Sequence, residues 1–162
     1  MKKPRVLFIC IKNSARSQMA EALFKQRCGE EFDAFSAGFE PGEINPLAVA
    51  ALSEVGIHIV GKKTQGIFDI YKSGQAMNYT VRVCSEAERS ARVCPIFPGL
   101  TERFEWDFND PAACSGNEEA KLARMRAVRD GIKAKIEQWC AEHCHAKDHN
   151  KLRATSSGEG NL

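Results

Sequence analysis

Cys10 and Arg16 enclose a five-residue polar loop that follows a short apolar run, Val6–Ile9, and precedes a helical pattern. Backbone N–H groups of such a loop converge on one point together with the positive end of the helix dipole, and that point attracts an anion. Arg16 can add a planar, bidentate fork for a tetrahedral oxyanion. The same field favours the thiolate, which is the nucleophilic form of a cysteine. The spacing therefore predicts an enzyme with a nucleophilic sulfur beside a phosphate-like anion.

Strand-like and helical patterns alternate along the rest of the chain. Strands are expected at 6–9, 32–37, 79–83 and near 104–106, and helices at 16–27, 46–55 and from about 117 to 140. This alternation predicts an α/β fold, a three-layer sandwich around a small four-stranded parallel sheet. The Cys10 loop then lies at the carboxyl end of the first strand, where open parallel sheets bind their ligands.

Length and composition limit the classes of protein that fit. The 162 residues predict a single catalytic domain over 1–146 and a polar tail over 147–162 that we expect to be disordered. A net charge of +2 gives no indication of nucleic-acid binding. No stretch approaches the ~20 apolar residues of a membrane span, and no signal peptide is recognisable. We therefore expect a cytoplasmic protein that acts as a monomer, without nucleic-acid or membrane partners.

Several motifs resemble the low-molecular-weight protein tyrosine phosphatase superfamily, and more closely its thioredoxin-coupled arsenate reductases. The first match is Cys10-Ile11-Lys12-Asn13-Ser14-Ala15-Arg16-Ser17-Gln18-Met19-Ala20-Glu21, where the phosphatases usually carry proline in place of Gln18. The resemblance extends over roughly Arg5–Trp139 and includes Ser36-Ala37-Gly38, Asn45-Pro46, Val55-Gly56-Ile57, Cys94-Pro95-Ile96-Phe97-Pro98-Gly99, Trp106, Asp110-Pro111-Ala112 and Val128-Arg129-Asp130.

The resemblance implies a role for each residue of the loop. Cys10 would be the nucleophile, and the oxyanion would lie on Ile11, Lys12, Asn13, Ser14, Ala15, Arg16 and Ser17. Asn13 would hold the loop in a strained shape, and Ser17 would donate a hydrogen bond to the Cys10 sulfur. Asp110 would be the general acid, although an Asp-Pro pair is also a common structural turn.

Two further cysteines distinguish a reductase from a phosphatase. Arsenate has the shape and charge of phosphate, but As(V) can accept two electrons from thiols. Cys84 ends the expected third strand, beside Cys10, and could attack the Cys10–arsenic adduct; Cys94 could then attack Cys84 and present a disulfide to thioredoxin. Disulfide partners need Cα atoms about 5.5 Å apart, and in a rigid fold Cys84 cannot lie that close to both Cys10 and Cys94. We therefore expect segment 85–93 to rearrange between the two steps. Alternatively, Cys84 and Cys94 could be accidental core and loop cysteines.

Some positions depart from the related reductases. Nine residues separate Cys84 from Cys94, more than is usual, and Arg82 stands where threonine is common. Some relatives hold a potassium ion through residues that match Asn13, Glu21, Ser36 and Thr64, but Gly66 stands where an aspartate would help. We expect no other cofactor and no other metal.

Other functions stay open from the sequence. A phosphatase would use Cys10, Arg16 and Asp110 alone, but Ala112 and Ala113 offer no aromatic platform for phosphotyrosine. A reductase could instead draw its electrons from glutaredoxin or a small thiol. A third alternative is a non-enzymatic module that binds oxyanions or metalloids.

The remaining cysteines allow a structural or a binding role. The seven cysteines contain no Cys-x-x-Cys pair, and structural disulfides are not expected in a reducing compartment. We interpret Cys28 as a small hydrophobe at a helix end and assign no role to Cys114. Near the C-terminus, Cys140, His143, Cys144, His145 and His149 could bind a soft metal or arsenite, but we favour a frayed helix end with incidental thiols.

Overall fold

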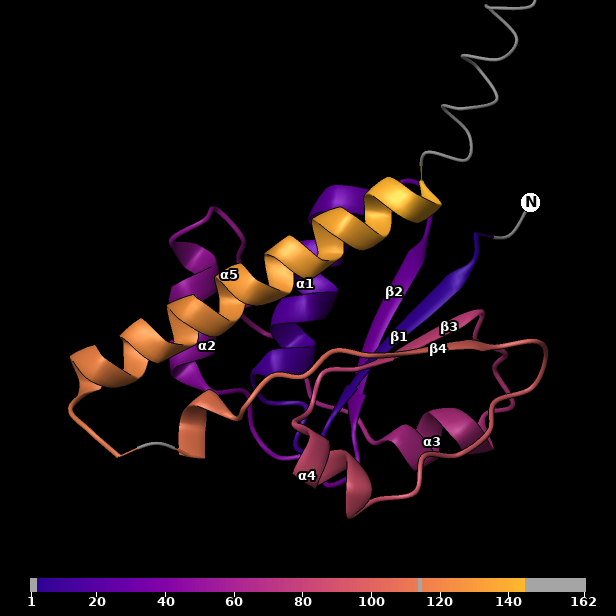
Figure 1. Cartoon of the computed structure of the whole chain (residues 1–162), viewed down its shortest axis with the longest axis horizontal. Helices are drawn as coiled ribbons and strands as arrows, with labels where there is room; N and C mark the ends of the chain where they lie inside the picture. The colour runs from indigo at the N-terminus through magenta and orange to yellow at the C-terminus, as the bar shows by residue number, and fades with distance from the viewer. Residues whose placement is uncertain (1–2, 114, 145–162) are drawn as a thin grey trace, which may run out of the picture.

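The computed structural model describes residues 3–113 and 115–144. Four strands form one sheet in the order β2-β1-β3-β4, and every neighbouring pair is parallel. The strands are β1 Arg5–Cys10, β2 Asp33–Gly38, β3 Tyr79–Arg82 and β4 Glu102–Glu105. The helices are α1 Arg16–Cys28, α2 Pro46–Ser53, α3 Ile67–Lys72, α4 Glu86–Ser90 and α5 Glu118–His143, with a 3-10 turn, η1, at Pro111–Ala113. The predicted α/β sandwich around a four-stranded parallel sheet is confirmed (Figure 1).

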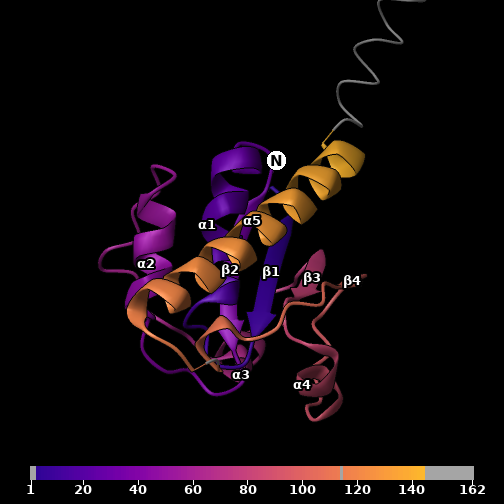
Figure 2. The same cartoon turned by 60° about the vertical axis from the view of Figure 1, so that its left-hand side comes forward.

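Two apolar cores lie on opposite faces of the sheet because β1 is apolar on both sides. Val6 and Phe8 join a large core with residues of α1, α2 and α5. Leu7 and Ile9 join a smaller core with α3 and Phe97. Figures 1 and 2 show α1, α2 and α5 gathered together, with α3 at the carboxyl ends of the strands. All four strands therefore end on the same edge, where their carboxyl-terminal loops meet.

Helices α2 and α5 begin at side-chain caps that are visible in the sequence. Asn45 accepts a hydrogen bond from the backbone N–H of Leu47 at 2.9 Å, and Pro46 takes the first helical position of α2. Asn117 caps α5 in the same way, through the N–H of Ala120 at 2.8 Å. The predicted starts of these two helices are confirmed.

The short helices α3 and α4 were not predicted. Each has only five or six residues, too few for a helical period to stand out. α4 replaces part of the segment expected to be only marginally structured, and a capping box between Ser85 and Glu88 holds its first turn. The predicted tail over 147–162 lies outside the described residues. Within the described part, no helix is long and apolar enough to cross a membrane.

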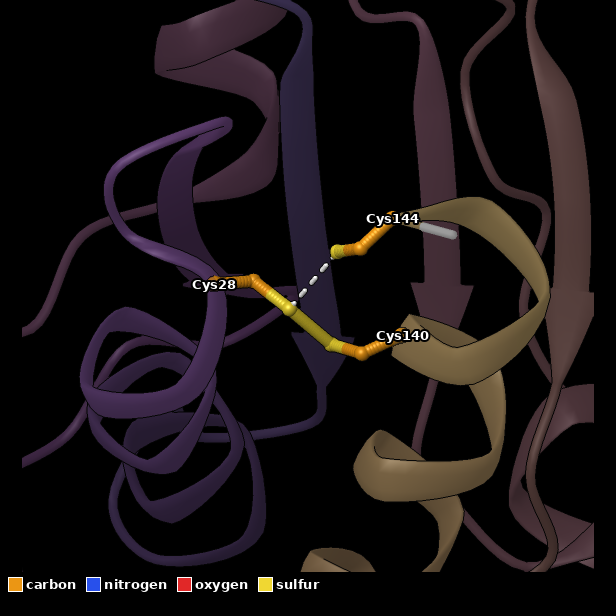
Figure 3. Close-up of side chains that lie close together, drawn as sticks. All are labelled: Cys28, Cys140 and Cys144. Atoms are coloured by element: carbon orange, nitrogen blue, oxygen red, sulfur yellow. Dashed lines mark hydrogen bonds between the residues drawn. A yellow bond between two sulfur atoms is a disulfide. The ribbon is translucent and has the colours of Figure 1, made fainter. Parts of the chain in front are cut away.

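The absence of a structural disulfide was a wrong expectation. Cys28 and Cys140 form a disulfide between the C-terminal ends of α1 and α5 (Figure 3). The packing of α1 against α5 brings these two cysteines together across 112 positions of sequence, a separation at which no local pattern reports the contact. Cys28 is buried as expected, but it is not merely a small hydrophobe.

Candidate active site

The Cys10 sulfur lies on the floor of the loop between β1 and α1. It is buried and accepts a hydrogen bond from the backbone N–H of Asn13 at 3.2 Å. The Ser17 hydroxyl lies 2.8 Å from the same sulfur. These contacts agree with the sequence-based placement of a nucleophile at Cys10 with Ser17 beside it, because both donors favour a negatively charged sulfur.

Asn13 fixes the shape of the loop. Its φ is 54°, in the left-handed region that asparagine tolerates better than most residues. Its fully buried amide donates to Ser17 at 2.8 Å and accepts from Gln18 at 2.9 Å. The N–H of Gln65 donates to the same Asn13 oxygen at 3.0 Å. This network matches the role that the resemblance implied for Asn13.

Gly38, at the end of β2, makes room for the loop. A Cβ atom there would lie 2.6 Å from the Ile11 carbonyl oxygen and 2.7 Å from the Asn13 nitrogen. Both obstacles are backbone atoms that cannot move aside cheaply. The glycine therefore lets β2 approach the anion loop at a distance that no side chain allows.

The loop turns its carbonyls away from the anion position. The carbonyls of Cys10, Ile11, Lys12 and Ser14 accept hydrogen bonds from backbone N–H groups of the segment 39–45, at 2.7–3.2 Å. In a trans peptide the following N–H points opposite to the carbonyl. The N–H groups of the loop are therefore turned inward, as the contact of the Asn13 N–H with the Cys10 sulfur shows directly.

Arg16 reaches the site but already holds a carboxylate. Its guanidinium donates to both oxygens of Glu88, at 2.6 and 2.9 Å, in the bidentate geometry that arginine offers to an oxyanion. It also donates to the carbonyl oxygen of Phe108 at 2.9 Å. The ion pair with Arg16 lowers the pKa of Glu88 to about 2, so this carboxylate is charged at neutral pH. Glu88 thus occupies the fork expected to bind the substrate.

Asp110 lies at the mouth of the same cavity. The cavity is small, about 60 Å³, and is lined by Cys10, Ile11, Lys12, Ser14, Ala15, Arg16, Glu88 and Asp110. One Asp110 oxygen accepts from the N–H of Ala112 at 2.9 Å and so begins η1. The structure confirms the turn and places Asp110 in the lining of the cavity, and its role as general acid stays a prediction.

Cys84 is fully buried just after β3, the neighbour of β1. Its sulfur lies 3.6 Å from the Ile9 carbonyl oxygen, one residue before Cys10. Burial, followed by the nearby Cys10 sulfur, raises the pKa of Cys84 to about 12. The structure thus brings Cys84 to Cys10 as predicted, but it keeps Cys84 as a neutral thiol at physiological pH.

Cys94 lies against the other face of the sheet. It is half-buried against the smaller core, whereas Cys10 and Cys84 belong to the larger one. Burial raises the pKa of Cys94 as well. The structure does not bring Cys94 to the site, so any exchange with Cys84 requires the intervening segment to move, as the sequence predicted.

The residues that could hold potassium do not fit a cation. The Asn13 oxygen already accepts two hydrogen bonds, and the Thr64 hydroxyl donates to the Gly42 carbonyl. The Glu21 carboxylate forms an ion pair with Lys62 and lies 3.8 Å from Lys25. The Lys62 ammonium thus neutralises the charge that would attract the ion. Two buried side-chain oxygens of the described residues lack a hydrogen-bond partner, Ser36 Oγ and Gln18 Oε1, and two oxygens do not make a site.

The predicted C-terminal cluster is divided. Cys140 and Cys144 lie together with Cys28, a residue that the sequence did not associate with them. His143 instead stacks on Trp139 with ring centroids 3.8 Å apart. His145 and His149 lie outside the described residues, as does Cys114.

Sequence reasoning missed two residues of the site, Glu88 and Phe108. The Ser85-x-x-Glu88 spacing is a readable capping signal, and the structure bears it out. The hydrogen-bonded ion pair of Glu88 with Arg16 spans 72 positions, and no pattern in the sequence predicts it. The Phe108 contact uses only a backbone carbonyl, which any residue would supply.

The Cys10 thiol lies beneath inward-turned backbone N–H groups and Arg16, at the carboxyl edge of a parallel sheet. This arrangement is typical of an enzyme of the cysteine-phosphatase type. The family model for low molecular weight phosphotyrosine protein phosphatases matches residues 5–151. The chain belongs to this family.

Relatives within this family share most of the chain. An arsenate reductase of Halalkalibacterium halodurans is 42% identical over 139 residues, which cover 86% of this chain and 96% of the relative. A solved arsenate reductase in the phosphate binding state has a TM-score of 0.69 and 27% identity, covering 86% of this chain and 98% of that one. A thioredoxin-dependent arsenate reductase of Corynebacterium glutamicum has a TM-score of 0.64 and 26% identity, covering 86% of this chain and 61% of that one.

Proposed function

We propose that this protein reduces arsenate to arsenite through Cys10, Cys84 and Cys94, with thioredoxin as electron donor. The observation that carries the proposal is the second buried thiol, Cys84, at the end of the strand beside Cys10. A phosphatase needs one thiol, because water completes its cycle. The relatives named as arsenate reductases support the same choice.

In the first step Cys10 attacks arsenate. The loop amides and Arg16 hold the anion, and the Cys10 sulfur forms a bond to arsenic as one arsenic–oxygen bond breaks. Asp110, at the mouth of the cavity, gives its proton to the departing hydroxyl, which leaves as water. Arsenic stays As(V) in this step.

In the second step the Cys84 thiolate attacks the Cys10 sulfur. A sulfur–sulfur bond forms, the sulfur–arsenic bond breaks, and its electron pair passes to arsenic, which leaves as As(III) in arsenite. Cys94 then attacks Cys84, frees the Cys10 thiolate and leaves a Cys84–Cys94 disulfide. Two electrons from an external dithiol reduce this disulfide and close the cycle.

Glu88 links the anion site to the segment that must move. α4 buries none of its residues, and Glu88 both closes its capping box and holds Arg16. An incoming oxyanion competes for the same guanidinium, so its binding releases Glu88 and removes one anchor of α4. Substrate binding thereby loosens the segment between Cys84 and Cys94 before the second step.

The surroundings of Cys94 favour a protein donor over a small thiol. Val93 is 87% exposed, Ile96 is 72% exposed and Leu100 is fully exposed. Apolar side chains that face water next to a reactive thiol suit a protein that covers them on binding. The thioredoxin-dependent relative from Corynebacterium glutamicum supports this donor.

A single turnover without a donor tests the proposal. Reduced protein is mixed with excess arsenate, arsenite is counted after denaturation, and disulfides are mapped by mass spectrometry. We expect about one arsenite per chain and a Cys84–Cys94 bridge. Cys10→Ser and Cys84→Ser should release no arsenite, and Cys94→Ser should stop at a Cys10–Cys84 bridge. Cys114→Ser is the matched control and should behave as the wild type.

The phosphatase alternative predicts a different pattern. The same loop should hydrolyse a small aryl phosphate weakly as a side reaction that needs Cys10 but neither Cys84 nor Cys94. Aryl phosphate hydrolysis without any arsenite would make the protein a phosphatase. A chain that binds the anion but turns over neither compound would be a non-enzymatic binding module.

A further inference from the structure

Three sulfur atoms meet at the far end of α1 from the anion loop. The Cys28, Cys140 and Cys144 sulfurs all lie within 4.8 Å of one another. Cys28 and Cys140 are joined as a disulfide, and the Cys144 sulfur lies 3.0 Å from that of Cys28 (Figure 3). Cys140 and Cys144 are four residues apart in α5 and so share one helical face. About 18 Å of helix separates Cys28 from Arg16, so this group is distinct from the active site.

The three cysteines of this group differ in their burial. Cys28 and Cys140 are buried in the large core, whereas Cys144 is half-buried. All three line an open cavity of about 390 Å³. Two cations, Lys25 and Arg27, and two carboxylates, Glu30 and Glu31, line the rest of its charged wall. A small ligand can therefore reach this group from solvent through the cavity.

We propose that, in the reduced protein, these three cysteines form a second site, which binds trivalent arsenic. A dithiol reductant first converts the Cys28–Cys140 disulfide into two thiols and is itself oxidised to a disulfide. Arsenous acid then exchanges its three hydroxyl groups for the three thiols, so three arsenic–sulfur bonds form and three waters leave. Arsenic remains As(III) throughout, and no further electron is exchanged.

The donor set favours arsenic over zinc. Soft thiolates select thiophilic ions, and the three sulfurs, all within 4.8 Å of one another, can converge on one ion once the Cys28–Cys140 bond is reduced. Among the described residues, the group contains three sulfurs and no nitrogen or oxygen ligand. Three-coordinate As(III) is complete with three thiolates, whereas structural zinc takes four ligands. This proposal rests on the proposed function at one point only, namely that the arsenite is the product of the Cys10 site.

The test uses the full chain with the active-site thiols removed. The background variant C10S/C84S/C94S is reduced, incubated with arsenite and desalted, and bound arsenic is counted by mass spectrometry. We expect one arsenic per chain, with three sulfur neighbours in its X-ray absorption spectrum. Adding Cys144→Ser should weaken binding at least tenfold while the half-buried position keeps the fold intact. Adding Cys114→Ser is the matched control and should change nothing.

Three results would overturn the proposal. The first is no retained arsenic in the reduced background variant, checked for its fold by circular dichroism. The second is equal binding after Cys144→Ser, because two thiols would then account for it. The third is retention of zinc and exclusion of arsenite when both ions are offered in equal amounts. In the otherwise wild-type chain, Cys144→Ser should leave the single turnover unchanged and lower retained arsenic by one per chain, so the two proposals fail independently.

Discussion

Glu88 gives Arg16 a partner before any substrate arrives. The bidentate pair resembles the contact that an oxyanion would make. In the free enzyme Glu88 therefore competes with the oxyanion for Arg16. Arg16 is buried, and an arginine buried without a counter-charge would be costly. Glu88 therefore stabilises the empty site and lowers its affinity for anions at the same time.

Glu88→Gln should strengthen anion binding. The neutral amide competes less well for the guanidinium, so we expect the dissociation constant for phosphate or arsenate to fall about tenfold, or about 1.4 kcal/mol. Phosphate inhibition of aryl phosphate hydrolysis measures this constant. Glu86→Gln removes one charge from the same helix and should have little effect. Equal affinities for wild type and Glu88→Gln would show that Glu88 does not compete with the anion.

The protonation state of Cys84 should set the pH dependence of arsenite release. Burial raises the pKa of Cys84 to about 12, so only a small fraction of Cys84 is a thiolate at pH 7. The thiolate fraction rises with pH, so the rate of Cys10–Cys84 disulfide formation should rise about tenfold per pH unit between pH 6 and 8. Rapid-quench mapping of this disulfide gives the rate. Aryl phosphate hydrolysis, which does not use Cys84, should lack this slope; a flat profile for disulfide formation would contradict the attack by Cys84.

α4 is held by polar contacts rather than by a core. Arg89 donates to the Cys84 carbonyl and lies near Glu105 and Asp107, and the N–H of Glu86 donates to Asp107 at 2.8 Å. Elements with few buried apolar contacts open at low free energy. This element lies between Cys84 and Cys94, where the proposed exchange of disulfides would need movement.

Saturating phosphate should loosen α4. When the anion takes Arg16, the amides of 86–90 should exchange about tenfold faster with solvent hydrogen, while the amides of the anion loop should exchange more slowly. Hydrogen exchange followed by mass spectrometry measures both regions. Amides of α2 are the internal control, and Glu88→Gln should remove the effect on α4. Slower exchange of 86–90 with phosphate would show that α4 instead closes over the anion.

The central strand β1 contributes side chains to both apolar cores of the molecule. In the region of the anion loop, the cation that pairs with Glu21 is Lys62. The Asn13 side chain bonds to Ser17 and Gln18 around the loop, and Lys62 pairs with Glu21 in the helix that follows it. A bound ion would raise the melting temperature only through its affinity for the folded state, and Lys62 lowers that affinity by occupying the carboxylate.

Potassium should therefore leave the stability unchanged. Replacing sodium by potassium at constant ionic strength should shift the melting temperature by less than about 1 °C. Differential scanning calorimetry in the two salts makes this comparison. Lys62→Met frees the Glu21 carboxylate and is the variant in which a potassium effect could emerge. A clear potassium stabilisation of the wild type would mean that Lys62 does not exclude the ion.

Patterns of neighbouring residues predict the strands, the longer helices and the anion loop. The buried strand, the capped helices and the Cys10–Arg16 spacing depend on neighbouring residues, because periodicity and capping act over a few positions. Cys84 is expected near Cys10 because both follow strands whose carboxyl ends meet at one edge of a parallel sheet, and the pairing of β3 with β1 comes from the structure.

Contacts between side chains that are distant in the sequence depend on tertiary packing. Glu88 pairs with Arg16 across 72 positions of sequence, and Cys28 forms a disulfide with Cys140 across 112. The placement of Cys94 against the opposite face from Cys10 also depends on how the chain crosses the sheet. Such contacts arise from the packing of whole elements, and packing depends on the shape and volume of many residues at once, which no short pattern records.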